Sequence, residues 1–266
     1  MSFGLLILIN LGVALGMMTL LWNISVMRKD ASVVDPFWGA GFVVLAAVTS
    51  QLVEMPDVRV WLLLIMITLW GVRLSGYLML RNRGKGEDRR YVAMREKRGA
   101  DFWWFSLFSV FLLQGFIMWV VSLPVQAGMY LASGEPLGLL DGLGFLAWLI
   151  GLGFESVGDY QMARFQSNPD NEGKVMDRGL WGLTRHPNYF GDFMVWWGVY
   201  LVALSAGAWW TFFSPALMSF FLIKVSGVAL LEKDISHRRP GYRDYIKKTN
   251  AFFPGPRRTF STDTDT

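Results

Sequence analysis

The feature that most constrains this chain is a series of apolar runs, each about 20 residues long, which is the length a helix needs to cross the hydrocarbon core of a bilayer. Hydrophobic residues make up 53% of the 266 residues and charged residues 17%, against about a quarter charged in soluble domains. The sequence therefore predicts an all-α polytopic membrane protein with seven transmembrane helices. We expect a single seven-helix domain over residues 1–255 and a disordered tail over 256–266. The predicted spans are 3–22, 35–53, 59–80, 102–124, 138–160, 190–206 and 208–231.

The basic residues are distributed asymmetrically between these runs. Of the 25 Lys and Arg residues, 22 follow the first, third, fifth or seventh run, whereas Arg59 flanks the opposite side. Loops rich in Lys and Arg stay in the cytoplasm. We therefore expect a multi-pass membrane protein with the N-terminus outside, the C-terminus inside and the basic loops in the cytoplasm. This placement accounts for the formal net charge of +4 without a nucleic-acid partner, and membrane lipids are the expected surroundings.

The residue types that are missing limit the chemistry. The chain has no Cys and two His, His186 and His237. Without Cys there is no disulfide, thiolate metal site or cysteine nucleophile, and two His are too few for the usual zinc site. We predict no metal site and expect a diffusible cofactor to carry the chemistry.

Ionisable residues recur inside the apolar runs, where they are costly and mark functional sites by default. Glu155 and Asp159 are four residues apart and share one helix face. Further groups lie toward the cytoplasmic ends of their runs: Asp35, Arg73, Asp192 and Lys224. We expect these groups either to line a polar cavity open to the cytoplasm or to snorkel and pair with one another.

The most informative segment is the predicted cytoplasmic stretch 159–192. Its cations suit phosphate groups, and they are Arg164, Lys174, Arg178 and Arg185. Asn188 and Asp192 can bind amide or ribose hydroxyl groups. Trp181 and Tyr189 can stack on a flat ring. The segment therefore predicts a nucleotide site, and an ordinary loop that touches lipid headgroups is the alternative.

The chain after the last run combines aromatic and basic residues. Tyr242 and Tyr245 are three residues apart, so they share one face of a helix. Together with His237, they either lie on the membrane surface or fold back as a lid over a ligand.

Several motifs resemble one known family. The run 179–192 contains Gly-Leu-Trp, Arg-His-Pro-Asn-Tyr and Gly-Asp, and this combination resembles the signature of the steroid 5-alpha-reductase superfamily. Asp-Pro-Phe-Trp-Gly at 35–39 and Gly-Glu-Asp-Arg-Arg-Tyr at 86–91 resemble the bacterial branch of that superfamily. The resemblance extends over residues 30–255.

The resemblance implies NADPH-dependent reduction of a carbon–carbon double bond in a lipid-soluble, steroid-like substrate, such as a 3-oxo-4-ene steroid. It also implies a bacterial inner-membrane protein whose cytoplasmic loops bind the cofactor and whose substrate enters from the bilayer. By motif, it implies cofactor contacts from Asn82, Arg83, Asp159, Arg164, Arg185, Asn188, Tyr189 and Asp192. The predicted cofactor site adds further residues of the same segment and of the tail: Lys174, Arg178, Trp181, His186, His237, Tyr242 and Tyr245.

The resemblance also suggests catalytic residues. Reduction of an enone needs a group that stabilises the enolate forming at its oxygen, and the family uses a Glu and a Tyr. Residues 51–56 resemble the family's Glu-x-Pro element, which suggests Glu54, and Tyr77 is the candidate Tyr. A span that ends at residue 53 places Glu54 near the outer surface. As a proton donor, Glu54 would need burial and a raised pKa.

Two other functions remain open. Membrane methyltransferases of the isoprenylcysteine or phospholipid type share the Arg-His-Pro-x-Tyr element at 185–189 and a Glu followed by Tyr-x-x-Tyr, here Glu232, Tyr242 and Tyr245. Their cofactor, S-adenosylmethionine, has no phosphate, so the basic residues of the segment favour the reductase. A non-catalytic lipid-binding or scaffold protein would leave the pattern at 159–192 unexplained.

Overall fold

A computed structural model describes residues 1–54, 56–225 and 241–258. These residues contain no β-strand, and strand-like pairing is limited to one parallel bridge between Thr184 and Asn250. Two π-helical turns, Leu107–Leu112 and Phe221–Val225, follow α5 and α10. The helices are α1 (Phe3–Arg28), α2 (Val34–Leu52), α3 (Val58–Asn82), α4 (Arg89–Arg98), α5 (Phe102–Ser106), α6 (Leu113–Val121), α7 (Leu123–Tyr130), α8 (Leu139–Ser167), α9 (Pro187–Ser205), α10 (Phe213–Phe220) and α12 (Tyr242–Lys248).

Five helical stretches are long and apolar enough to cross a membrane. The prediction of an all-helical protein with several membrane-length helices is confirmed. The sixth and seventh predicted spans correspond to α9 and, as far as residue 225, to α10 with its π-helical turn, which are shorter or more polar. The five stretches are Phe3–Arg28, Ala31–Leu52, Val58–Asn82, Arg89–Val121 and Leu139–Ser167.

The chain divides into two compact units. Unit 1 comprises Met1–Gly142 and Val199–Ser214, and unit 2 comprises Leu143–Gly198 and the chain from Pro215 onward. The boundaries fall inside α8, α9 and α10, and the single domain predicted over residues 1–255 stays a prediction. The predicted tail at 256–266 lies within the described residues only as far as Arg258.

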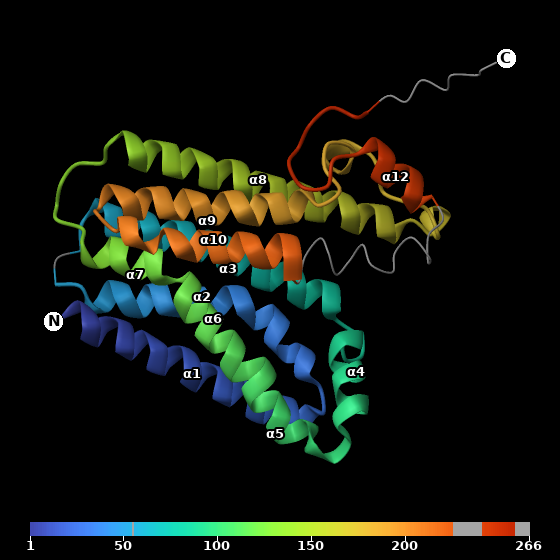
Figure 1. The fold of residues 1–266 in the computed structure, drawn as a ribbon, viewed down its shortest axis with the longest axis horizontal. Coiled ribbons are helices and arrows are strands. Elements are labelled where there is room, and N and C mark those ends of the chain that lie inside the picture. Colours follow the sequence, from blue (N-terminus) through green and yellow to red (C-terminus); the bar gives the residue numbers. More distant parts are fainter. Residues whose placement is uncertain (55, 226–240, 259–266) are drawn as a thin grey trace. The chain divides into compact units, whose positions relative to one another are not determined.

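In unit 1, α2 and α3 pack side by side through glycines (Figure 1). A Cβ atom added to Gly71 would lie 2.6 Å from the carbonyl oxygen of Gly39, so the two backbones touch and no side chain fits between them. Close backbone approach at small residues is a common way for helices to associate in lipid. The rings of Phe42 and Trp70 meet edge to face at 5.6 Å beside this contact.

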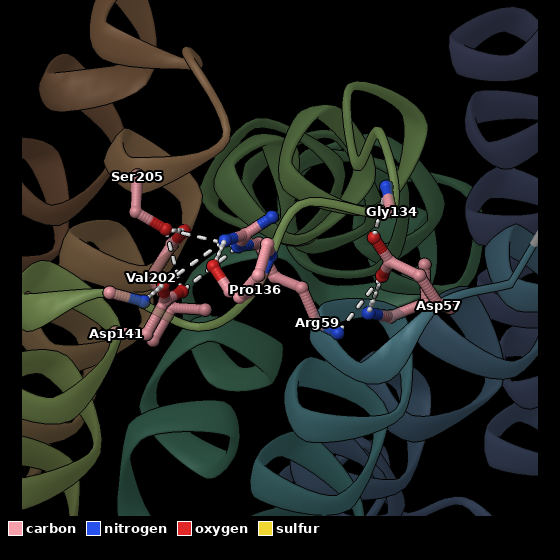
Figure 2. Close-up of polar contacts among 9 residues, drawn as sticks. Asp57, Arg59, Gly134, Pro136, Asp141, Val202 and Ser205 are labelled. Atoms are coloured by element: carbon pink, nitrogen blue, oxygen red, sulfur yellow. Dashed lines mark hydrogen bonds and ion pairs between the residues drawn. The ribbon is translucent and has the colours of Figure 1, made fainter.

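Unit 1 also contains a buried ion pair (Figure 2). Arg59 and Asp141 are 3% and 1% exposed. The guanidinium donates from Nε to Oδ1 at 2.9 Å and from Nη2 to Oδ2 at 3.1 Å. Ser205 donates its hydroxyl to Oδ1 at 2.6 Å, and the Gly138 amide donates to Oδ2 at 2.8 Å. The carboxylate of Asp141 is therefore saturated from three directions within the fold.

The residue that caps α3 extends this polar cluster. The side chain of Asp57 accepts hydrogen bonds from the amides of Arg59 and Val60 at 2.9 and 3.0 Å, which is the usual role of an N-cap aspartate. Its other oxygen accepts from the Gly134 amide at 2.9 Å (Figure 2). The loop between α7 and α8 is thus tied to the start of α3.

In unit 2, α8 and α9 also run side by side through glycines (Figure 1). A Cβ atom on Gly191 would lie 2.6 Å from the Gly151 carbonyl oxygen, and one on Gly158 would lie 3.3 Å from the ring of Pro187. Pro187 is the first residue of α9, a position that proline favours. The start of α9, and the segment that leads into it, is therefore held against α8.

Candidate functional site

The loop that follows α8 folds back onto that helix. Gly179 has φ +61°, a conformation that favours glycine. The amide of Leu180 then donates to the side-chain oxygen of Gln161 at 3.0 Å, and the indole of Trp181 donates to the Gly158 carbonyl at 3.0 Å. Trp181 is 9% exposed. This indole anchors the loop on α8, and its predicted stacking on a ligand ring stays a prediction.

The C-terminal chain returns to this loop and runs beside it. The amide of Arg185 donates to the Asn250 carbonyl at 2.9 Å, and the hydroxyl of Thr184 donates to the Phe252 carbonyl at 2.8 Å. Further along, the Gly255 amide donates to the Leu183 carbonyl at 3.1 Å. Two segments about 70 residues apart in sequence therefore form one structure.

Arg185 contacts the C-terminal end of α12. It is 8% exposed, and its Nη1 donates to the carbonyls of Thr249 and Ile246 at 2.6 and 3.2 Å. These carbonyls lie at the C-terminal end of α12, where helices leave acceptors unsatisfied and cations are favoured. Arg185 therefore holds α12 in place through this nitrogen, and its predicted contact with a phosphate stays a prediction.

The two tyrosines of α12 face the same loop. Tyr242 and Tyr245 are 6% and 5% exposed, and their rings meet edge to face at 5.4 Å. The hydroxyl of Tyr245 donates to the Trp181 carbonyl at 2.5 Å. Burial raises the pKa of the Tyr245 phenol above its ordinary value. Of the two predicted positions for the tail, α12 takes the folded-back one.

Unit 2 contains a cavity of about 640 Å³, a volume within the range of small-molecule and cofactor pockets. Figure 1 shows α12 (red) beside the loop that follows α8, and residues of both segments form the walls. Four of the lining residues are cations and two are carboxylates. The charged and amide residues that line it are Asn168, Asn171, Lys174, Asp177, Arg178, Asp244, Lys248 and Arg257.

Among the described residues that line this cavity, cations outnumber carboxylates four to two. Arg257 pairs with Asp177, with 2.9 Å between Nη2 and Oδ2. Two of the three further cations, Lys174 and Arg178, come from the loop, and Lys248 comes from the end of α12. The second carboxylate, Asp244, pairs with Lys247, which does not line the cavity. The cavity is therefore suited to an anionic ligand.

Three of the predicted cofactor-binding residues line this cavity: Lys174, Arg178 and Tyr245. Arg164 is exposed in the last turn of α8. The sequence reading missed Lys248 and Arg257, whose only signal was their place in the basic tail. His237 lies outside the described residues.

A second group of predicted residues gathers around the start of α9. His186 and Tyr189 stack with ring centroids 5.5 Å apart and 7° between the planes. Asn188 accepts a hydrogen bond from the Tyr189 amide at 3.1 Å, and Asp192 follows in the second turn of the helix. Asp159 is 7% exposed on α8.

The remaining predicted residues belong to unit 1. Asn82 and Arg83 stand at the C-terminal end of α3, beyond Tyr77, whose ring lies 5.8 Å from the Arg81 guanidinium. Glu54 precedes the other end of α3. The helix between Val58 and Tyr77 is about 28 Å long at 1.5 Å per residue. The structure therefore does not bring the two predicted catalytic residues together.

The surroundings of Glu54 differ from those of a proton donor. Its side chain is 79% exposed and pairs with the amino group of Met1. This hydrogen bond lowers the pKa of the Glu54 carboxyl below its ordinary value. A general acid at neutral pH needs the opposite shift.

Within the part of the chain that the structure describes, no group of three or more His, Cys, Asp or Glu side chains is placed to hold a metal ion. A family model described as "Protein of unknown function (DUF1295)" matches residues 21–249. No solved structure matches the chain.

Two curated proteins are similar to the chain. "Uncharacterized protein C594.04c" of Schizosaccharomyces pombe is 26% identical over 268 residues, which cover 88% of this chain and 75% of that protein. "Probable O-methyltransferase ustE" of Ustilaginoidea virens is 31% identical over 120 residues. That second match covers 45% of this chain and 37% of the other protein's length.

Proposed function

The chain belongs to the DUF1295 family of proteins of unknown function, and we propose from the cavity in unit 2 that it binds NADPH and reduces a carbon–carbon double bond of a lipid-soluble enone. A 3-oxo-4-ene steroid is a representative substrate of this class. The proposal includes seven membrane crossings, a cytoplasmic C-terminus and a place in a bacterial inner membrane.

One observation carries the proposal: a cavity of cofactor size lined by four cationic side chains from two segments. NADPH has a pyrophosphate and a ribose 2′-phosphate, so it presents several negative charges at separate points. Arg forms paired hydrogen bonds with phosphate oxygens and Lys binds phosphate as a point charge. Lys174, Arg178 and Lys248 are the residues that would hold these groups.

The chemistry needs two things from the chain. Bound NADPH supplies a hydride to the carbon β to the ketone, and the protein supplies a proton donor at the ketone oxygen. Of the two predicted donors, the proposal excludes Glu54, because its side chain is exposed and pairs with the amino group of Met1.

The test is ligand binding by the detergent-purified full-length chain. At 100 times its dissociation constant, a ligand that binds only the folded state adds about 2.7 kcal/mol of stability. We expect NADPH to raise the Tm, NADH to raise it less, and S-adenosylmethionine to leave it unchanged. Consumption of NADPH should then depend on an added 3-oxo-4-ene steroid. Stabilisation by S-adenosylmethionine alone would contradict the proposal.

A second candidate function is methyl transfer from S-adenosylmethionine. It is favoured by the similarity of 120 residues to a protein named as a probable O-methyltransferase. The tyrosines of the predicted methyltransferase element, Tyr242 and Tyr245, are buried toward the loop, and Glu232 lies outside the described residues. The same binding experiment separates the two functions, because one cofactor carries phosphates and the other does not.

The proposed topology has its own test, which the absence of Cys from the sequence makes simple. Two exposed positions, Glu135 and Lys247, receive a single cysteine each, as Glu135→Cys and Lys247→Cys. In intact cells, a membrane-impermeant maleimide should label the first variant and spare the second until the cells are opened. The reverse labelling pattern would show that the orientation is opposite to the proposed one. Labelling of both variants in intact cells would contradict an odd number of membrane crossings.

A further inference from the structure

A second pocket in unit 2 shares no lining residue with the cation-lined cavity. It measures about 440 Å³ and is lined by residues 250–254, which follow α12. That volume falls within the range of small-molecule sites. Its lining consists of two phenylalanines, a proline, an alanine and an asparagine, so no charged side chain is among the described residues that form it. This aromatic pocket is therefore suited to a neutral ligand.

The backbone of the aromatic pocket is held by the segment that precedes α9. The hydroxyl of Thr184 donates to the Phe252 carbonyl at 2.8 Å, and the amide of Arg185 donates to the Asn250 carbonyl at 2.9 Å. These bonds fix the backbone of the pocket within the fold of unit 2. A site that is ordered before its ligand arrives loses less entropy on binding.

Rings of α9 support the two phenylalanines of the pocket. The ring centroid of Phe190 lies 6.2 Å from those of both Phe252 and Phe253. The centroid of Phe193 lies 5.6 and 5.8 Å from the same two rings. All four pairs meet edge to face, a geometry that aromatic pairs favour. The aromatic wall is therefore positioned by ring contacts as well as by backbone bonds.

The two phenylalanines of the pocket differ in exposure. Phe252 is 6% exposed, whereas Phe253 is 60% exposed, although both rings contact the same two residues of α9. Phe252 thus belongs to the interior of unit 2. Phe253 presents a fixed aromatic face on which a flat apolar molecule can pack.

The pocket also has one polar side chain that is available to a ligand. Asn250 is half-buried, and its side-chain amide makes no hydrogen bond within the described residues. Small-molecule pockets are mainly apolar and contain a few polar groups that orient the ligand. A carboxamide can donate to a ketone oxygen. Asn250 therefore provides the group that would fix the direction of a bound ketone.

We propose that the aromatic pocket binds the flat ring system of a lipid-soluble ketone. The ring of Phe253 packs against the ligand, and the Asn250 amide donates to the ketone oxygen. The choice of a ketone rests on the proposed function, since the substrate proposed there is an enone. Binding itself requires no NADPH, because the pocket and the cation-lined cavity have separate linings.

The test is protection of a cysteine in the full-length chain, which has no Cys of its own. Ala251→Cys places a thiol in the pocket, and Lys247→Cys places one at an exposed position of α12 that lines neither cavity. Both variants are reconstituted in phosphatidylcholine nanodiscs without NADPH, and the rate of labelling by a maleimide is measured. The probes are a 3-oxo-4-ene steroid and its 3-deoxy analogue.

At ten times its dissociation constant, the steroid ketone should slow labelling of Ala251→Cys about tenfold, since only the free site reacts. Labelling of Lys247→Cys should stay the same. The 3-deoxy analogue should bind up to about tenfold more weakly, because it lacks the acceptor for Asn250. Equal protection by the two steroids would make the pocket a general contact with lipid. Equal slowing at both cysteines would be an effect of the membrane. Either result overturns the proposal.

A second variant tests the aromatic face. In the Ala251→Cys background, Phe253→Ala should raise the steroid concentration for half-protection about tenfold, and Phe253→Tyr should restore it. The control is Phe220→Ala, which removes a ring that is 54% exposed elsewhere in unit 2. The Tm of Phe253→Ala should stay unchanged, because the ring is largely exposed. Half-protection that is unaltered in Phe253→Ala, or shifted equally in the control, would overturn the proposal.

The pocket and the proposed reductase can fail separately. Protection of Ala251→Cys by the steroid, without any rise in Tm from NADPH, would support the pocket and contradict the reductase. A rise in Tm from NADPH, without protection by the steroid, would overturn the pocket and leave the cofactor site intact.

Discussion

Unit 1 and unit 2 each contain a cluster of cations and carboxylates near the ends of helices, and they use these groups in opposite ways. In unit 1, Arg59 and Asp141 are buried and saturate each other, with Ser205 completing the set (Figure 2). In unit 2, Lys174 and Arg178 line a cavity in which cations outnumber carboxylates. The difference shows that charge balance and burial, and not residue type, separate a structural ion pair from a candidate ligand site.

The largest expected effect is the loss of stability when one partner of the buried Arg59–Asp141 pair is removed. Asp141→Ala leaves the Arg59 guanidinium buried without its carboxylate, which costs about 3–5 kcal/mol. The Tm of the detergent-purified protein should fall by about 10 °C. Nucleotide affinity, measured below that temperature, should stay the same.

The matched control removes both charges. Arg59→Met combined with Asp141→Leu should recover much of the lost stability, since a buried ion pair is often no better than a well-packed apolar pair. If Asp141→Ala instead abolished NADPH binding at an unchanged Tm, the cluster in unit 1 would be part of the binding site.

The next effect concerns the cavity. Lys174→Gln with Arg178→Gln removes two cations that would bind phosphate, and each hydrogen bond from a charged donor contributes about 1.5–3 kcal/mol. NADPH should bind at least about a hundredfold more weakly, as measured by titration of the folded variant. Arg243→Gln with Lys247→Gln is the control of equal charge outside the cavity. Equal affinities in the two variants would remove the cavity as the cofactor site.

A smaller effect is expected at the contact that joins α12 to the loop. Tyr245→Phe removes the hydroxyl that donates to the Trp181 carbonyl at 2.5 Å, and an unsatisfied buried acceptor costs about 1–3 kcal/mol. At neutral pH the Tm should fall accordingly. Tyr160→Phe, which removes the hydroxyl of a tyrosine that is 62% exposed, should leave the Tm unchanged.

The raised pKa of Tyr245 predicts that the unfolding free energy depends on pH. Burial raises the pKa of Tyr245 above its ordinary value of 10.0, so the folded state holds the phenol proton more tightly than the unfolded state. The resulting stability is complete below pH 10 and is lost as the pH rises beyond it. The difference in unfolding free energy between the wild type and Tyr245→Phe should therefore shrink above pH 10. A constant difference would show that the hydroxyl is not buried in solution.

The smallest expected effect is a gain in NADPH affinity. Asp244 lines the cavity, and its carboxylate repels a phosphate ligand. Its side chain is 71% exposed, so solvent screens the repulsion to below about 1 kcal/mol. Asp244→Asn should tighten NADPH binding by up to about fivefold in the same titration. Glu172→Gln, an exposed carboxylate that does not line the cavity, should change nothing.

The helices themselves were predictable from the sequence. Apolar runs at 3–22, 35–53 and 59–80 predicted α1, α2 and α3 because a chain in hydrocarbon can satisfy its backbone groups locally only as a helix. α8 continues to Ser167, past the predicted end at 160, since the first proline after that point is Pro169. Hydrophobicity marked the span, and local helix propensity set its end.

The sequence by itself determined an all-helical protein with membrane-length apolar helices, and it located a polar segment at 159–192 that carries four cations. Only the tertiary structure decided which cations support the fold and which line the cavity. Arg185 supports α12, whereas Arg257 joins the cavity from a distant part of the chain. Helices form from contacts a few residues apart, which a local pattern records. The buried pair and the cavity depend on contacts 82 and 80 residues apart, and such contacts exist only once the chain has folded.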